Sequence, residues 1–123
     1  MTTTIVPLQP HGGSFRLDGA THRSIPGTWS ISGGPSHHGM AGGMTVAQID
    51  SGALKVTVLP GRGMGLWKAS GAGHELCWQS PVRSGPVNPS LVNAHRRGGI
   101  GWLDGFDELL CRCGLAFNGP PGK

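Results

Sequence analysis

The chain has 123 residues, a length that suits one small domain. Glycine (23) and proline (10) are abundant and predict a loop-rich chain, whereas four tryptophans and several Val/Leu runs indicate a folded core. The 10 basic and 6 acidic residues give a net charge of +4 and are dispersed along the sequence, which argues against a nucleic-acid partner.

Cysteine usage and hydropathy exclude further classes. The three cysteines, Cys77, Cys111 and Cys113, are an odd number, which argues against a disulfide framework. The first residues lack the basic and apolar regions of a signal peptide. No apolar run approaches the roughly 18 residues that cross a bilayer. We therefore expect a cytoplasmic protein without a membrane partner.

The first third of the chain predicts a leader and two short strands. Residues 1–13 are polar with two prolines, and we expect a flexible leader. In Ser14–Ala20, apolar and charged residues alternate before an Asp-Gly turn, which is typical of a strand. Thr28–Ser32 alternates in the same way, with Trp29 and Ile31 on one face.

A glycine-rich loop, Gly33–Gly43, carries His37 and His38. Histidine is a common metal ligand. However, adjacent side chains on an extended loop point apart, and no third ligand follows at a recognisable spacing. We predict no metal site and no cofactor.

The clearest strands are Met44–Ile49 and Ala53–Leu59, and Asp50-Ser51-Gly52 between them predicts a hairpin turn. Pro60 ends the second strand. The glycine-rich run that follows is no phosphate-binding loop, because Gly-Lys-Ser/Thr is missing. Further strands are expected at Leu66–Ala69 and Leu76–Gln79, with a turn over Ser70–Glu75 between them and an ordered loop over Ser80–Asn93.

The stretch Arg96–Leu115 contains half of the acids, and its glycines break it into tight bends. Apolar residues at i, i+3, i+4 and i+7 from Phe106, with Asp104 as a cap, predict a short helix over 104–110. The alternative is one helical turn followed by a strand over Leu109–Leu115. The residue pattern favours the helix.

The same stretch holds candidate binding residues. Asp104, Asp107 and Glu108 are either a functional carboxylate pair or a solvated acidic turn balanced by the nearby arginines, and we favour the solvated turn. Trp102 lies between glycines in a bend, where its ring can stack on an apolar ligand face or pack in the core. Both interpretations stay open.

Arg112 lies between Cys111 and Cys113. On a strand its side chain would point away from both cysteines, and cysteines are usually buried. Its planar guanidinium suits sugar hydroxyls and carboxylates, although an ordinary surface arginine is an equal alternative. Cys-x-Cys is a poor zinc spacing, so buried structural thiols are favoured over a metal site or a nucleophile.

Three sequence blocks point to a known family. GGIGWLDGFDELLCRCGL (Gly98–Leu115) is followed by Asn-Gly-Pro-Pro, and VLPGRGMGLWKA (Val58–Ala69) and WQSPV (Trp78–Val82) precede it. In order and spacing these blocks resemble an uncharacterised branch of the aldose 1-epimerase-like, or galactose mutarotase-like, family. The resemblance covers most of the chain from Trp29. It implies an all-β fold, with 1–123 as a single domain that forms the N-terminal part of a larger β-sandwich. It also leads us to prefer the helical turn and strand over the helix at 104–110.

The family resemblance implies an aldose ligand and isomerase chemistry. Aldose 1-epimerases exchange anomers by general acid and base catalysis of ring opening. The family's carboxylate and histidine for this step lie later in the chain than these blocks, so no catalytic residue is assigned and this chain alone is expected to be inactive. The candidate substrate-binding residues are Arg62, Trp102, Asp107, Arg112 and Asn118.

Two alternative functions remain. One is a non-catalytic carbohydrate-binding or vestigial domain. The other is a metal-binding interaction module that uses His37, His38, Cys111 and Cys113. Because part of a sandwich leaves sheet edges and an apolar face uncovered, we also expect self-association.

Overall fold

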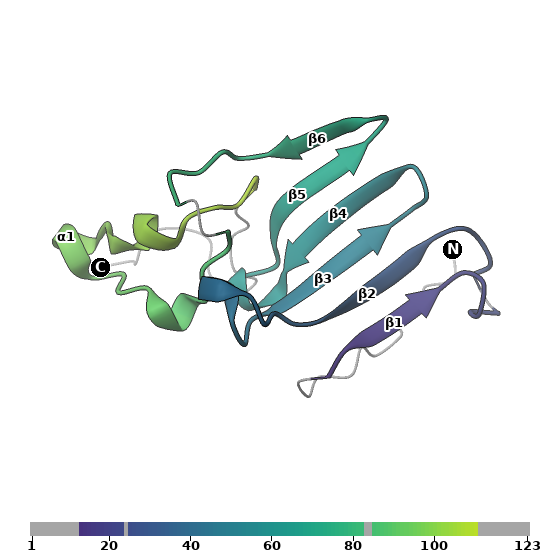
Figure 1. The fold of residues 1–123 in the computed structure, drawn as a ribbon, viewed down its shortest axis with the longest axis horizontal. Helices are drawn as coiled ribbons and strands as arrows, with labels where there is room; N and C mark the ends of the chain where they lie inside the picture. The colour runs from purple at the N-terminus through teal and green to yellow at the C-terminus, as the bar shows by residue number, and fades with distance from the viewer. Residues whose placement is uncertain (1–12, 24, 83–84, 111–123) are drawn as a thin grey trace, which may run out of the picture.

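The computed structural model describes residues 13–23, 25–82 and 85–110, and its main feature is one antiparallel sheet (Figure 1). Within these residues six strands pair in chain order, which confirms the all-β prediction. The strands are β1 (Phe15–Asp18), β2 (Ser30–Pro35), β3 (Thr45–Asp50), β4 (Leu54–Leu59), β5 (Gly65–Gly71) and β6 (His74–Cys77).

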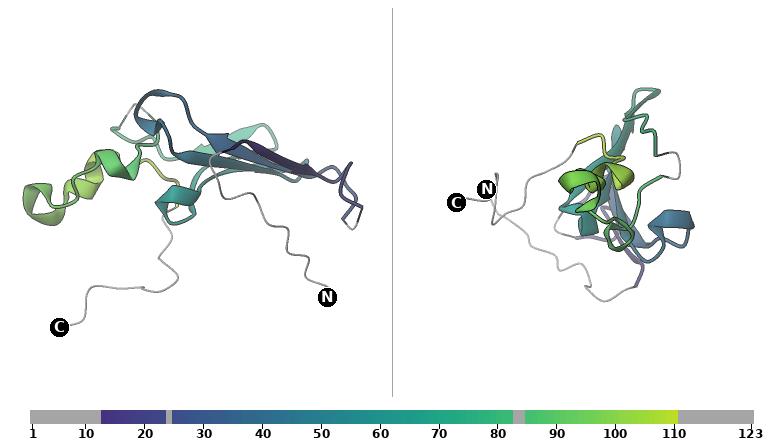
Figure 2. Two further views of the ribbon diagram at one scale, coloured as in Figure 1. Left: turned by 90° about the horizontal axis from the view of Figure 1, so that it is seen from below. Right: turned by 90° about the vertical axis from the view of Figure 1, so that its left-hand side faces the viewer.

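Short helical turns lie beyond one end of the sheet (Figures 1 and 2). The longest is a 3-10 helix over Gly101–Gly105, preceded by the four-residue α1 (Arg96–Gly99). Other 3-10 turns cover Gly39–Ala41, Pro60–Arg62 and Pro89–Leu91. We call this end, with residues 78–82 and 85–110, the loop end. Among the described residues, no helix has both the length and the apolar character to cross a membrane.

The central hairpin follows the prediction from its alternating pattern and turn residues. β3 and β4 pair from Ala47 with Val58 to Asp50 with Lys55. In the turn, Asp50 Oδ1 accepts the backbone N–H of Gly52 at 2.8 Å, and Gly52 has a φ of 87°, which favours glycine. The predicted hairpin at Asp50-Ser51-Gly52 is therefore confirmed.

The predicted bounds of other strands were wrong. β2 extends through Gly33 and Gly34 to Pro35, into the segment expected to be a loop, because these glycines let β1 and β3 approach closely. A Cβ atom at Gly33 would lie only 2.7 Å from the Phe15 ring. The glycines thus serve pairing here, rather than a loop.

The turn expected over Ser70–Glu75 is also shorter. β5 continues to Gly71 and β6 begins at His74, so two residues connect them. Ala72 and Gly73 have φ values of 49° and 78°, the left-handed geometry of a tight hairpin. β6 ends at Cys77, two residues before the end predicted for this strand.

The two faces of the sheet differ in polarity, because side chains alternate along each strand and the register aligns them across strands. Figure 2 shows the sheet edge-on as a single layer. On the apolar face, Ile49, Leu54 and Leu76 are 43%, 48% and 58% exposed. One register row of this face runs through Leu17, Ile31, Ile49, Val56, Ala69 and Leu76; the adjacent row on the opposite face runs through Arg16, Ser32, Gln48, Thr57, Lys68 and Cys77.

A small core lies where the sheet meets the loop end. Leu59 is fully buried and packs with Ala41 and Met44, and Val46 and Trp67 pack against them. Thr57 pairs with Lys68 but Val58 pairs with Leu66, so Trp67 is the extra residue of a β-bulge. A bulge redirects a side chain relative to strict alternation, which accounts for Trp67 packing beside Val46.

The helix predicted over 104–110 is absent there. The 3-10 helix ends at Gly105, Phe106 has an extended backbone, and residues 106–108 have no regular secondary structure. Leu110 then forms an antiparallel bridge with Leu66 of β5, so backbone pairing with the sheet replaces helical hydrogen bonds. This agrees with the alternative of a helical turn followed by a strand, as far as Leu110. The rest of that predicted strand, and the predicted leader apart from Gly13, lie outside the described residues.

Candidate functional site

The predicted binding residue Arg62 belongs to the turn between β4 and β5. Pro60 ends β4 and opens a 3-10 turn. Gly63 and Met64 then have left-handed φ values of 63° and 62°, which return the chain into β5. Arg62 forms an ion pair with Glu108, and its Nη1 donates to the Val87 carbonyl oxygen at 3.0 Å. The side chains of Arg62 and Glu108 are only 14% and 2% exposed.

Asp107 is joined to the same network. Its Oδ2 accepts the indole N–H of Trp67 at 3.0 Å. Its backbone N–H donates to Glu108 Oε2 at 3.1 Å. Asp107 is 7% exposed as a residue and Glu108 is 3% exposed. We call Arg62, Trp67, Asp107 and Glu108 the buried polar cluster.

Pairing with the sheet fixes the two acids in this position. Leu110 and Leu66 exchange backbone hydrogen bonds of 3.0 and 2.9 Å, and the Leu109 N–H donates to the Trp67 carbonyl at 3.3 Å. On the other side of the acids, the Ser80 hydroxyl donates to the Phe106 carbonyl at 2.6 Å. The segment 106–110 is therefore held at both ends, and its acids point into the cluster.

Burial raises the pKa of the Asp107 carboxyl above its usual value, because desolvation disfavours the charged form. The Trp67 hydrogen bond and the charges of Lys68 and Arg62 oppose this rise in pKa, whereas the negative charge of Glu108 adds to it. A buried carboxyl whose pKa is raised is a typical feature of functional sites, although structural networks show it too. The Lys68 ammonium lies 4.5 Å from the centroid of the Trp67 ring.

The prediction that the acids Asp104, Asp107 and Glu108 form a solvated turn is correct for Asp104 and wrong for the other two. Asp104 is exposed and pairs with Arg97 and, at 3.6 Å, with Arg96. Asp107 and Glu108 are buried instead, because segment 106–110 pairs with the start of β5. Sequence reasoning missed Glu108 as the partner of Arg62 and Trp67 as the hydrogen-bond donor to Asp107. The partners are 46 residues apart, so local spacing carried no signal for them.

Trp102 lies apart from the buried polar cluster, on the Gly101–Gly105 turn. It is 48% exposed, and its ring meets that of Phe106 edge to face, with centroids 5.6 Å apart. The structure thus brings Arg62 and Asp107 together, whereas Trp102 contacts Phe106, the residue before Asp107. The other two predicted binding residues, Arg112 and Asn118, lie outside the described residues.

Two cavities lie near the cluster: one is lined by Trp67 of the cluster, and the other by Phe106, the residue before Asp107. One, of about 350 Å³, is mainly apolar and is lined by residues that include Trp67, Val46, Pro86 and His38. The other, of about 460 Å³, lies at the loop end and is lined by residues that include Trp78, Phe106, Arg97 and Asp104. Both volumes fall in the range of small-molecule sites.

The proposed metal ligands can be placed only in part. His37 and His38 are exposed, whereas Cys111 and Cys113 lie outside the described ranges. In residues 13–23, 25–82 and 85–110, no three His, Cys, Asp or Glu side chains gather as a metal ion would require.

The protein is thus an all-β structure: an open antiparallel sheet with a buried polar cluster and two cavities at one end. Residues 41–123 match the family described as a domain of unknown function, DUF4432. The chain belongs to this family. No curated protein matches it.

Comparison with solved structures extends this assignment. The chain resembles the crystal structure of a putative aldose 1-epimerase from Klebsiella pneumoniae, with 34% sequence identity and a TM-score of 0.69. The similarity covers 78% of this chain but 25% of the Klebsiella chain. It confirms the family resemblance and an all-β fold of the galactose mutarotase type. This chain therefore spans about a quarter of the length of that relative.

Proposed function

We propose that this chain binds an aldose and is a carbohydrate-binding part of an aldose 1-epimerase-like protein of the cytoplasm. The observation that carries the proposal is the 34% identity, at a TM-score of 0.69, to the putative aldose 1-epimerase from Klebsiella pneumoniae. The cavities beside the buried polar cluster support it, since they have the size and the mixed apolar and polar lining of ligand sites.

In this proposal the loop end supplies the sugar contacts. The half-exposed ring of Trp102 would stack on the apolar face of a pyranose, and the Phe106 ring beside it would contact the same sugar. Arg62 and Asp107 would contribute polar contacts from the cluster, although Arg62 already forms an ion pair with Glu108. Arg112 and Asn118 would complete the site from the sequence that follows residue 110.

Anomer exchange requires a general base for the anomeric hydroxyl and a general acid for the ring oxygen, on opposite sides of the hemiacetal. The raised pKa of Asp107 suits a proton donor better than the usual pKa of an aspartate does, but Asp107 is buried, with 7% of the residue exposed. We therefore propose that this chain binds the sugar and, by itself, does not accelerate anomer exchange.

Saturation-transfer difference NMR with glucose and galactose tests the binding, and exchange NMR of the two anomers tests the catalysis. We expect magnetisation transfer to the sugar ring without accelerated exchange. Sorbitol, which has no hemiacetal ring, is the control ligand. The proposal is wrong if neither aldose receives more magnetisation than sorbitol. Zinc stoichiometry on the same sample tests the metal-binding alternative.

A further inference from the structure

The residues that line the cavity at the loop end indicate which class of sugar it would bind. It lies between the segment after β6 and the Gly101–Gly105 turn, and its volume is about 460 Å³. Its lining residues are Trp78, Ser80, Pro81, Val82, Arg97, Leu103, Asp104 and Phe106. Aromatic, aliphatic and charged groups therefore meet in one small space.

The apolar part of the lining is a rigid aromatic surface. Trp78 is 50% exposed and thus presents much of its ring to solvent. Phe106 is held in place, since Trp102 packs against its ring and Ser80 binds its backbone carbonyl. Flat aromatic faces of this kind suit the C–H surface of a pyranose ring.

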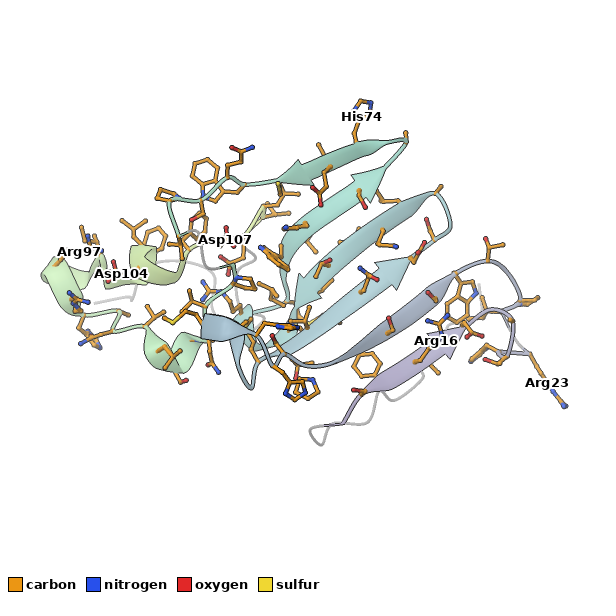
Figure 3. The ribbon with its side chains drawn as sticks, viewed as in Figure 1. Arg16, Arg23, His74, Arg97, Asp104 and Asp107 are labelled. Atoms are coloured by element: carbon orange, nitrogen blue, oxygen red, sulfur yellow. The ribbon has the colours of Figure 1, made fainter. Side chains whose placement is uncertain are left out.

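The lining holds one charged residue of each sign, Arg97 and Asp104, and Arg96, which lies outside the lining, gives this group of three charges a net charge of +1. Asp104 is shared by two guanidinium groups, those of Arg97 and Arg96. Arg97 is 53% exposed, and within the described residues it donates one hydrogen bond, to Asp104. Figure 3 shows Arg97 and Asp104 together at the loop end, far from Arg23 at the opposite end of the molecule.

The backbone of Arg97 has a conformation that is uncommon for a residue other than glycine. Its φ is 52°, a left-handed value that glycine adopts freely, and Gly98 and Gly99 beside it also have positive φ. Holding a non-glycine residue there costs of order 1 kcal/mol. Such an outlier on a cavity wall motivates a functional hypothesis for the side chain.

We propose that this cavity binds an aldose that carries an anionic group, a carboxylate or a phosphate. Trp78 and Phe106 lie against the sugar ring, and the planar fork of Arg97 donates paired hydrogen bonds to the anion. This inference rests on the proposed aldose binding and specifies its substrate class.

Titrations monitored by tryptophan fluorescence test the inference with four probes: glucose, glucuronate, glucose 6-phosphate and inorganic phosphate. We expect an anionic aldose to bind more tightly than glucose. Arg97→Gln should weaken it about tenfold, the effect of losing a charge-assisted hydrogen bond, and leave glucose unchanged. Arg23→Gln, at an exposed arginine of the opposite end, is the matched control and should change neither affinity.

A second variant separates binding from folding. Arg97→Gly suits the left-handed backbone, so it should keep the melting temperature of the parent while losing the preference for the anionic aldose. Preference for glucuronate or for glucose 6-phosphate supports the inference and identifies the anion.

Equal binding of glucose and both anionic aldoses overturns the inference but leaves aldose binding intact. Inorganic phosphate that binds as tightly as glucose 6-phosphate overturns it as well, because the sugar ring then contributes nothing. If no aldose binds, the proposed function fails together with it.

Discussion

The ion pair between Arg62 and Glu108 should be a main determinant of stability. Arg62→Met leaves the Glu108 carboxylate, 2% exposed, without a counter-charge and removes the donor to the Val87 carbonyl. Removal of one partner from a buried pair costs about 3–5 kcal/mol. With a urea m-value of about 2 kcal/mol/M, a loss of about 4 kcal/mol lowers the unfolding midpoint by about 2 M.

A double-mutant cycle in urea tests this reasoning. The double variant Arg62→Met, Glu108→Met leaves no charge behind, so it should be clearly more stable than the sum of the single losses predicts. Asp104→Asn is the control, because its exposed pairs with arginines contribute only about 0–1 kcal/mol. The argument is refuted if Arg62→Met costs no more than this control.

Three further predictions follow from other parts of the structure. Because burial raises the pKa of Asp107, the folded chain keeps a proton that the unfolded chain loses, so this group's contribution to stability declines as the pH rises from 3.8 towards the folded pKa. Trp67→Phe removes an opposing hydrogen bond and should raise this pKa further, as carbon NMR of the carboxyl measures; an unchanged or lower pKa contradicts the assigned cause. Leu54→Lys, on the apolar face, should reduce self-association in analytical ultracentrifugation, and a parent chain that is already monomeric contradicts this prediction. Gly101→Ala should cost about 3 kcal/mol in urea unfolding, since its methyl group would overlap a backbone carbonyl. Gly61→Ala should cost little, since its methyl group would reach only ordinary contact with Met44; equal losses contradict this.

Local patterns in the sequence predicted the sheet well. The alternation of Leu54, Val56 and Val58 with polar residues, and the Asp-Ser-Gly turn, identified the β3–β4 hairpin. The errors arose where glycines have more than one use. Gly33 and Gly34 were predicted to lie in a loop, but they allow three strands to approach closely. Only the tertiary structure shows whether a glycine forms a loop or permits close strand pairing.

The candidate site was predicted less completely, because its contacts are between distant segments. Arg62 and Asp107 were chosen separately, and the structure joins them through Glu108, while Trp67 donates a hydrogen bond to Asp107. The helical spacing from Phe106 favoured a helix, but pairing with β5 supplies more backbone hydrogen bonds at Leu109 and Leu110 than a single exposed turn would. No pattern within one segment contains that information.

The indole N–H signals of the four tryptophans give the most direct test of the central claim, that this chain binds an aldose at its loop end. Trp78 and Trp102 lie at this end, whereas Trp29 donates to the Ile25 carbonyl at the opposite end. Nitrogen–proton NMR during a glucuronate titration, with signals assigned by Trp→Phe variants, should show saturable shifts of Trp78 or Trp102 and a fixed Trp29 signal. Shifts confined to Trp29, or no shift at any aldose concentration, would contradict the account.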